Sequence, residues 1–136
     1  MNPEPITQPL DTRERVREAV SAADDRKAVD LKVLQLEKIT DFTDYFLICS
    51  GTNERQVQAI VDEVEERLRH RGSKPIRREG RRDGRWVLLD YVDIVVHVQH
   101  AEERTYYALE RLWKDCPSLP LPADAVAPAE RAAGES

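Results

Sequence analysis

The amino-acid sequence predicts an α/β fold in which one sheet packs with amphipathic helices. Short apolar segments typical of strands alternate with longer segments whose apolar residues recur three and four positions apart. The segment 45–51, YFLICSG, is apolar at nearly every position, as expected for a strand in the middle of a covered sheet. The length of 136 residues corresponds to about one domain. We therefore expect a single α/β domain.

The composition excludes several classes of protein. Hydrophobic residues make up 40% and charged residues 35%, which allows a modest core under a highly charged surface. A net charge of -5 argues against a protein that coats nucleic acid. The sequence contains no run of about 18 apolar residues and no basic, apolar N-terminal signal, so we expect neither a membrane span nor secretion. Cys49 and Cys116 are isolated, which indicates free thiols in a reducing cytoplasm.

The N-terminal half predicts two helices and two strands. Residues 1–11 contain three prolines and are expected to form a disordered lead. Asp11 and Glu14 have capping-box spacing, which starts a helix that ends near Arg26. Strands are expected at 31–36 and 45–51. The second helix, between Asn53 and Gly72, has the clearest apolar face in the chain, formed by Val57, Ile60, Val61, Val64 and Leu68.

The segment 67–85 is strongly basic. It holds nine lysines and arginines against two carboxylates, and it predicts a short strand at 74–78 followed by an exposed loop. The simpler interpretation is a solvated basic loop. The alternative is a contact to RNA phosphates through Arg81, Arg82 and Arg85. No aromatic residue is interleaved, so the segment offers no base-stacking platform.

Residues 84–98 predict a β-hairpin with a two-residue turn at Tyr91-Val92. The expected cross-strand pairs are Asp90 with Asp93, Leu88 with Val95, and Trp86 with His97. Since strand side chains alternate between faces, these six share one face, while the aliphatic residues Val87, Leu89, Ile94 and Val96 form the other. The aliphatic face is the expected core. The mixed face is the first place to look for a partner.

The C-terminal segment predicts one more helix, from His100 to Cys116, closed by Pro117. We assign four of its aromatic and aliphatic residues to core or dimer contacts: Tyr106, Tyr107, Leu109 and Trp113. The tail 118–136 is rich in alanine and proline and is expected to be disordered. The folded domain is thus predicted to span residues 12–117.

Catalytic chemistry has little support from the residues alone. Asp90 and Asp93 would be close enough to share a divalent cation as cross-strand neighbours, although two solvated turn carboxylates are the simpler interpretation. Cys49-Ser50-Gly51-Thr52 precedes a helix and could hold an anion, but helix capping explains it equally well. The three histidines have no ligand spacing with a cysteine. We expect no cofactor.

Several separated blocks carry a family resemblance. They are DYF (44–46), SGT (50–52), RQV (55–57), GRWVLLDYVDIVVHV (84–98) and ERTYYALERLW (103–113). Together they resemble the ribosomal silencing factor family, also called the Iojap family, over about residues 13–117. The resemblance implies a mixed β-sheet flanked by helices, similar to nucleotidyltransferases but without their catalytic pattern.

The resemblance also implies a function. Members of the family bind large-subunit ribosomal protein fourteen, obstruct docking of the small subunit, lower translation when nutrients are scarce, and commonly form homodimers. Carried onto this sequence, the binding surface would consist of Trp86, Leu88, Asp90, Tyr91, Asp93 and His97. The sequence departs from the family at Val92, where glycine is frequent, and at Gln99, usually an apolar position. That second departure predicts a less buried strand end.

Two other functions remain as alternatives. One is a nucleotidyltransferase-like enzyme that uses Asp90 and Asp93 with a divalent metal. The other is a dimeric adaptor whose partner is not the ribosome.

Overall fold

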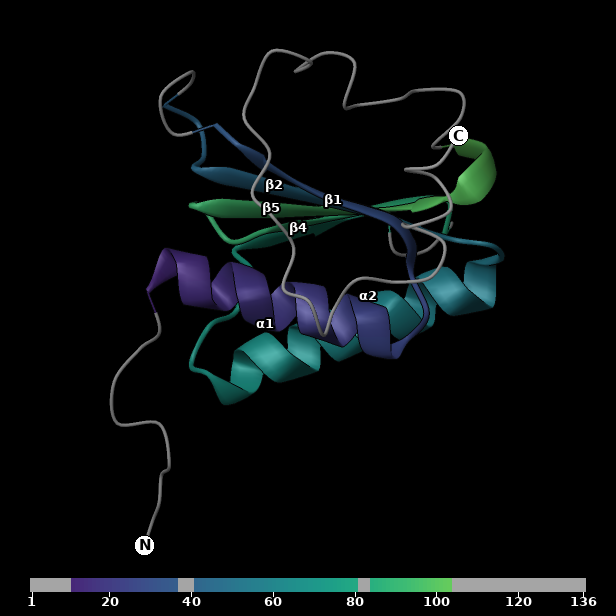
Figure 1. Ribbon diagram of the computed structural model, residues 1–136, viewed down its shortest axis with the longest axis horizontal. Coiled ribbons are helices and arrows are strands. Elements are labelled where there is room, and N and C mark those ends of the chain that lie inside the picture. Colours follow the sequence, from purple (N-terminus) through teal and green to yellow (C-terminus); the bar gives the residue numbers. More distant parts are fainter. Residues whose placement is uncertain (1–10, 37–40, 81–83, 104–136) are drawn as a thin grey trace, which may run out of the picture.

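The computed structural model describes residues 11–36, 41–80 and 84–103. Two helices and five strands follow one another along this part of the chain (Figure 1): α1 (Thr12–Asp25), β1 (Val29–Gln35), β2 (Tyr45–Gly51), α2 (Glu54–His70), β3 (Arg77–Glu79), β4 (Trp86–Asp90) and β5 (Ile94–His100). The predicted elements within the described ranges are confirmed, with boundaries shifted by a few residues. The predicted C-terminal helix after residue 103 and the two terminal segments lie outside the described residues, apart from Asp11.

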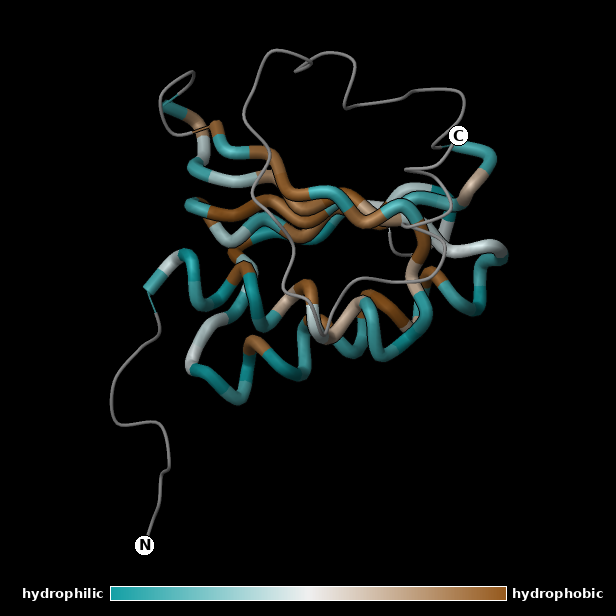
Figure 2. The backbone as a smooth tube through the Cα atoms, in the orientation of Figure 1, coloured by the Kyte–Doolittle hydropathy of each residue, from teal (hydrophilic) through white to brown (hydrophobic). Residues whose placement is uncertain are grey.

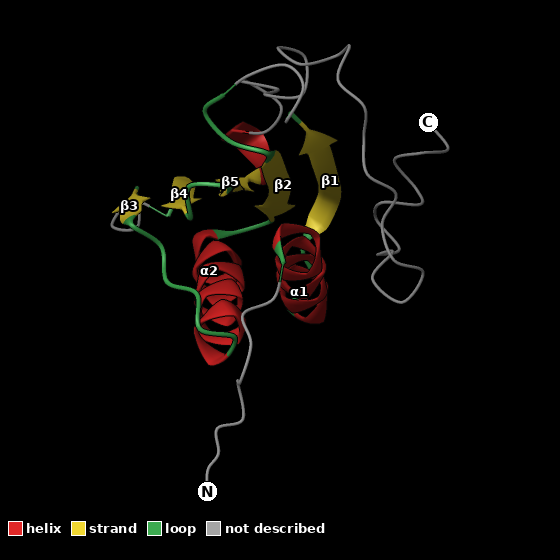
Figure 3. Cartoon of the chain, turned by 90° about the vertical axis from the view of Figure 1, so that its left-hand side faces the viewer, coloured by secondary structure: helices red, strands yellow, loops and turns green. Residues whose placement is uncertain are grey.

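The strands form one mixed sheet in the order β1-β2-β5-β4-β3. β2 and β5 are parallel, whereas the other neighbouring pairs are antiparallel. Both helices lie on the same side of the sheet, as Figure 3 shows from the end of the strands. The apolar strand β2 is an internal strand of the sheet, as its composition predicts. The expected mixed α/β architecture is therefore confirmed.

Local hydrogen bonds determine where both helices begin and where α2 ends. The Asp11 side chain accepts from the Glu14 backbone N–H, and the Glu14 side chain accepts from the Asp11 N–H, so the predicted capping box is present. Asn53 caps α2 by accepting from the Gln56 N–H at 2.8 Å. Gly72, at φ +80°, follows the end of α2, and the Ser73 N–H donates back to the Leu68 carbonyl.

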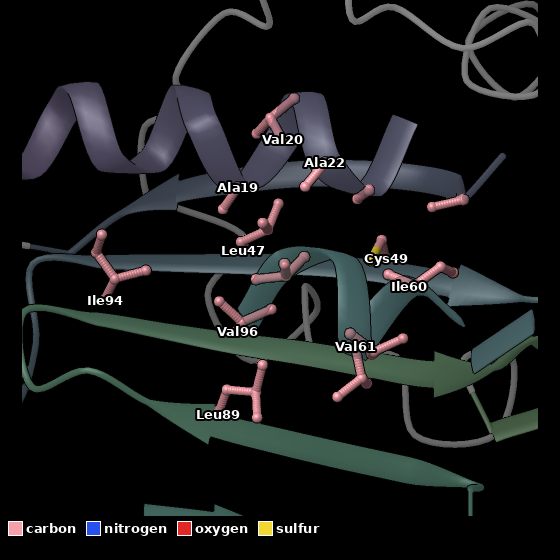
Figure 4. Packing of buried hydrophobic residues seen from close by; sticks show 14 of the residues in the cluster. Ala19, Val20, Ala22, Leu47, Cys49, Ile60, Val61, Leu89, Ile94 and Val96 are labelled. Atoms are coloured by element: carbon pink, nitrogen blue, oxygen red, sulfur yellow. The ribbon is translucent and has the colours of Figure 1, made fainter. Parts of the chain in front are cut away.

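The main core lies between the helices and the sheet. The predicted apolar face of α2 is fully buried there, together with the stripe of α1 and alternate residues of the strands. Figure 2 shows the hydrophobic segments of the helices turned toward the sheet, and Figure 4 shows Ile60 and Val61 of α2 beside Leu47, Leu89 and Val96 of the strands. One face of β4 and β5 therefore packs against the helices, and the alternate side chains of both strands lie on the opposite side of the sheet.

The predicted hairpin register is wrong by two residues. Asp90 pairs with Val95, Leu88 with His97, and Trp86 with Gln99. The turn is centred on Val92-Asp93, because the Tyr91 N–H bonds to the Ile94 carbonyl. A shift of two preserves the alternation of side chains, so Trp86, Leu88 and Asp90 still share one face. The hydrophobic pattern could not distinguish the two registers.

Candidate partner-binding surface

The mixed face of the hairpin lies on the side of the sheet away from the helices. We call it the hairpin face and define it as Trp86, Leu88, Asp90, Val95, His97 and Gln99. Trp86, Leu88, Asp90 and Val95 are half-buried, whereas His97 is 5% exposed and Gln99 is fully buried. A second, smaller apolar cluster of Leu34, Leu36 and Ile48 packs with Phe46 and Trp86 on this side. The expectation that the strand would be less buried at Gln99 is wrong.

Trp86 and His97 are joined directly. The Trp86 Nε1–H donates to His97 Nδ1 at 3.1 Å, and the Phe46 ring meets the imidazole edge-on with centroids 4.8 Å apart. An Nδ1 that accepts a hydrogen bond requires the neutral tautomer with its proton on Nε2. Burial lowers the pKa of His97 to about 4, which favours the same neutral form. The imidazole therefore orients the indole and carries no charge near pH 7.

Hydrogen-bonding capacity on this face is left unused. Within the described residues, His97 Nε2 and both side-chain polar atoms of Gln99 are buried without a hydrogen-bond partner. A buried polar atom left unsatisfied costs about 1–3 kcal/mol. On the helix side, Tyr91 Oη and Asp93 Oδ1 at the turn are also buried without a hydrogen-bond partner among the described residues. The hairpin face thus combines a half-buried indole with polar atoms that the described fold does not use.

Asp90 and Asp93 are separated in the structure. Asp90 accepts from the Val92 N–H at 2.8 Å and pairs with Arg77 at 3.2 Å. Asp93 turns toward the helix side, where it accepts from the Thr12 hydroxyl at 2.7 Å and pairs with Arg15. The prediction that the two carboxylates face each other is therefore wrong. In the part of the chain that the structure describes, no group of three acidic, histidine or cysteine side chains could hold a metal ion.

Tyr91 also lies away from the hairpin face. It belongs to the helix-side core and is 5% exposed. Burial raises the pKa of its hydroxyl, and the Glu65 carboxylate acts in the same direction. Its expected position near the partner-binding residues is wrong, because the turn lies one residue further along the chain than predicted. Of the six predicted binding residues, the structure brings together Trp86, Leu88, Asp90 and His97.

The basic segment is largely neutralised where the structure describes it. Arg85 pairs with Glu102 at 3.0 Å and Glu103 at 3.1 Å, and these carboxylates raise the pKa of its guanidinium. Five other arginines of the segment also pair with carboxylates: Arg67, Arg69, Arg71, Arg77 and Arg78. Arg81 and Arg82 lie outside the described residues, as do Tyr106, Tyr107, Leu109 and Trp113. The RNA contact stays a prediction.

Sequence reasoning missed Phe46 and Gln99 as members of this side. Phe46 belongs to β2, and it meets His97 because β2 lies parallel to β5 with Phe46 beside Val95. No local pattern shows which strands are neighbours across a sheet.

Two surface hollows of about 470 and 480 Å³ lie near the loop after α2, and neither includes Trp86, Leu88 or His97. Among the described helices, none is long and apolar enough to cross a membrane.

Comparison with known protein families matches residues 9–136 to the family described as "Ribosomal silencing factor during starvation". The chain belongs to this ribosomal silencing factor family. A ribosomal silencing factor RsfS from Halalkalibacterium halodurans is 44% identical over 112 residues, which cover 82% of this chain and 96% of that relative. The RsfS of Bacillus subtilis is 46% identical over 103 residues, covering 76% and 87%.

The fold is similar to solved structures of related sequence. A crystal structure from Bacillus halodurans aligns with a TM-score of 0.72 at 44% identity and covers 81% of this chain and 100% of that one. The ribosomal silencing factor resemblance and the α/β fold expected from the sequence are both confirmed.

Proposed function

We propose that this chain binds large-subunit ribosomal protein fourteen through the hairpin face and blocks association of the two ribosomal subunits. Translation would fall as a result when nutrients are limiting. Membership of the ribosomal silencing factor family supports the ribosome as target. The main structural support for this binding site is the half-buried Trp86 on β4, whose indole donates a hydrogen bond to His97 and lies beside Leu88.

A small number of residues supplies most of the binding energy of a typical protein interface. Tryptophan is among the residues that most often dominate binding energy, particularly where neighbouring aliphatic groups exclude water. Here the hydrogen bond to His97 orients the indole before binding, which lowers the entropy lost on association. The Asp90 carboxylate lies four residues after Trp86 on the same strand and suits a basic ribosomal protein. Blocking by occupancy requires no catalytic group.

We also propose that the protein is cytoplasmic and forms a homodimer. Light scattering of the purified full chain, alone and with the ribosomal protein, would measure both states. A monomer at all concentrations would remove the dimer from the proposal without affecting the ribosomal partner.

Co-sedimentation with purified large ribosomal subunits tests the function. We expect the wild type to sediment with the subunits, and Trp86→Ala and Asp90→Lys to lose most binding while remaining folded. Asp62→Lys, on the outer side of α2, is a matched charge reversal that should bind as the wild type does.

Two outcomes would contradict the proposal in different ways. If Trp86→Ala and Asp90→Lys both bind normally, the ribosomal function stands but the hairpin face is not the site. If the wild type does not sediment at all, the non-ribosomal adaptor becomes the better hypothesis, and a pull-down from lysate would identify its partner. Calorimetry with Mg²⁺ and nucleotide tests the enzyme alternative, which requires measurable binding at millimolar ligand.

A further inference from the structure

Three large apolar side chains that are exposed in the described residues lie at one end of the sheet. They are Phe42 (89% exposed), Ile76 (69%) and Val92 (56%), and we call them the loop-end surface. Each belongs to a different connection: Phe42 precedes β2, Ile76 precedes β3, and Val92 joins β4 to β5. Figure 3 views the strands from this end.

Backbone hydrogen bonds tie the three connections together. The Asp44 and Tyr45 N–H groups donate to the Asp93 carbonyl, and the Ile76 N–H donates to the Asp90 carbonyl at 2.7 Å. In sheet order, Val92 therefore lies between Phe42 and Ile76. The four strands involved span about 14 Å, from a spacing of about 4.8 Å between neighbours. A patch of this width is large enough to receive several side chains of a partner.

Val92 has a backbone conformation that valine rarely adopts. Its φ is +77°, and the Asp93 N–H bonds to the Tyr91 carbonyl at 3.0 Å, which forms a tight γ-turn. A β-branched residue with positive φ is strained, whereas glycine adopts this conformation at little cost. The turn persists because Asp90 accepts from the Val92 N–H and because Thr12 and Arg15 hold Asp93.

The exposed valine side chain does not explain this strain. More than half of it faces solvent, so it adds little to the core that would offset an unfavourable backbone. Strained residues that the surrounding structure holds in place often have a functional role. An exposed apolar patch is likewise typical of a site of interaction. Strain and exposure coincide at Val92, which points to a contact outside the monomer.

Acidic and basic side chains lie at opposite ends of the loop-end surface. Asp41 and Asp44 flank Phe42, and neither forms an ion pair with any described residue. Lys74 and Arg77 flank Ile76 at the other end, and Arg77 pairs with Asp90. Arg15, Arg71 and Lys74 line one hollow with Val92, so the surface is acidic beside Phe42 and basic beside Val92 and Ile76. A partner segment would place its cations over Phe42 and its neutral or acidic groups over Ile76.

We propose that the loop-end surface is a second contact for the ribosomal protein that occupies the hairpin face, and that it binds an apolar side chain flanked by lysine or arginine. This inference rests on the proposed function and adds a contact to it. The two surfaces are continuous, because Asp90 belongs to the hairpin face while its carboxylate and carbonyl accept from Val92 and Ile76. The carboxylates of Asp41 and Asp44, which form no ion pair with a described residue, favour a basic segment as the occupant.

Two substitutions of Val92 separate binding from stability. Val92→Gly relieves the positive φ and installs the residue that is frequent here in the family, so its unfolding midpoint should rise. Because the proposed valine contact is particular to this chain, its affinity for purified large ribosomal subunits should fall about tenfold below that of the wild type, as for an interface residue of moderate importance. Val92→Thr keeps the shape and the strain but replaces a methyl with a hydroxyl. It should keep the midpoint close to that of the wild type and weaken binding as well. A merely structural role for Val92 predicts that Val92→Gly binds at least as well as the wild type.

Charge reversal tests the identity of the partner. The double variant Asp41→Lys/Asp44→Lys should weaken binding to the subunits and to purified ribosomal protein fourteen, and the loss should shrink as salt is raised. Lys74→Glu, at the basic end, is the matched control and should not weaken binding. Equal losses from both changes would contradict a basic segment over Phe42.

Comparison with Trp86→Ala distinguishes the two proposals. If the Val92 and Phe42→Ser variants bind like the wild type while Trp86→Ala does not, the loop-end contact is wrong and the proposed function stands. If Trp86→Ala binds normally and the Val92 variants do not, the loop-end contact is supported and the hairpin face is wrong. Loss of binding in both sets supports both surfaces. A wild type that does not bind overturns both proposals.

Discussion

The two faces of the sheet are built from the same strands but differ in chemistry. On the helix side, Val87, Leu89, Val96 and Val98 are fully buried in the main hydrophobic cluster. On the other side, the alternate residues of the same two strands include a half-buried indole and two buried polar side chains, His97 and Gln99. A period-two alternation thus allows one hairpin to stabilise the fold with one face and to place the residues of the proposed binding site on the other.

Burial alone does not identify a residue's role. His97 is almost as buried as the valines beside it, yet it holds the Trp86 indole and has a buried N–H without a partner. A buried polar residue reduces the stability of a fold unless its hydrogen bonds are made. Buried polar atoms without a partner among the described residues also occur on the helix side of the turn, at Tyr91 Oη and Asp93 Oδ1, so what distinguishes His97 is its contact with the half-buried Trp86 indole.

Alanine substitutions of two neighbouring leucines should show the largest difference in stability between the two faces. Leu89→Ala leaves a cavity in the main core and should lower the free energy of unfolding by about 3 kcal/mol. Leu88→Ala makes the same chemical change on the half-buried face and should cost about 1 kcal/mol. Urea unfolding of both variants measures the two losses. Equal losses would mean that the hairpin face is as much a structural core as the helix side.

The second effect concerns His97 and pH. Its pKa is lowered by burial from 6.5 to about 4, so between these values the unfolded chain binds a proton that the folded protein does not. The stability contributed is fully present above pH 6.5 and is lost as the pH falls toward 4. The loss should reach about 3 kcal/mol at one imidazole. Chemical denaturation between pH 7 and 4 measures it, with His97→Gln as the control.

The control decides whether the loss belongs to His97. The carboxylates also titrate in this range, so the relevant quantity is the difference between the pH profiles of the wild type and His97→Gln. Parallel profiles would show that the imidazole is not buried and neutral as the structure describes, and would weaken the argument that it orients Trp86.

The third and smallest difference concerns the two aspartates of the turn. Asp93→Asn loses a charged partner of Arg15 at a partly buried site and should cost about 2 kcal/mol of stability. Asp90→Asn loses an ion pair with Arg77, whose side chain is 59% exposed, and should cost less than about 1 kcal/mol. Thermal unfolding measures both. A larger loss at Asp90 would reverse the structural and recognition roles assigned to the two carboxylates.

Much of the local structure could be predicted from the sequence. The capping box at Asp11 and Glu14, the apolar face of α2 and the stop at Gly72 follow from residues within a few positions of one another. The alternation in β4 and β5 placed Trp86 and Leu88 on one face and Val87 and Leu89 on the other. These features depend on backbone periodicity, which neighbouring residues encode directly.

The tertiary structure alone decided the register, the neighbours and the strain. A register shift of two residues leaves the alternation unchanged, so the hairpin pattern fits both pairings, and contacts at the turn select one. Asp93 turns toward the helices because Thr12 and Arg15, about 80 positions earlier in the chain, lie beside it. Phe46 reaches His97 only because β2 and β5 are parallel neighbours. Such contacts join distant segments, and no local pattern encodes them.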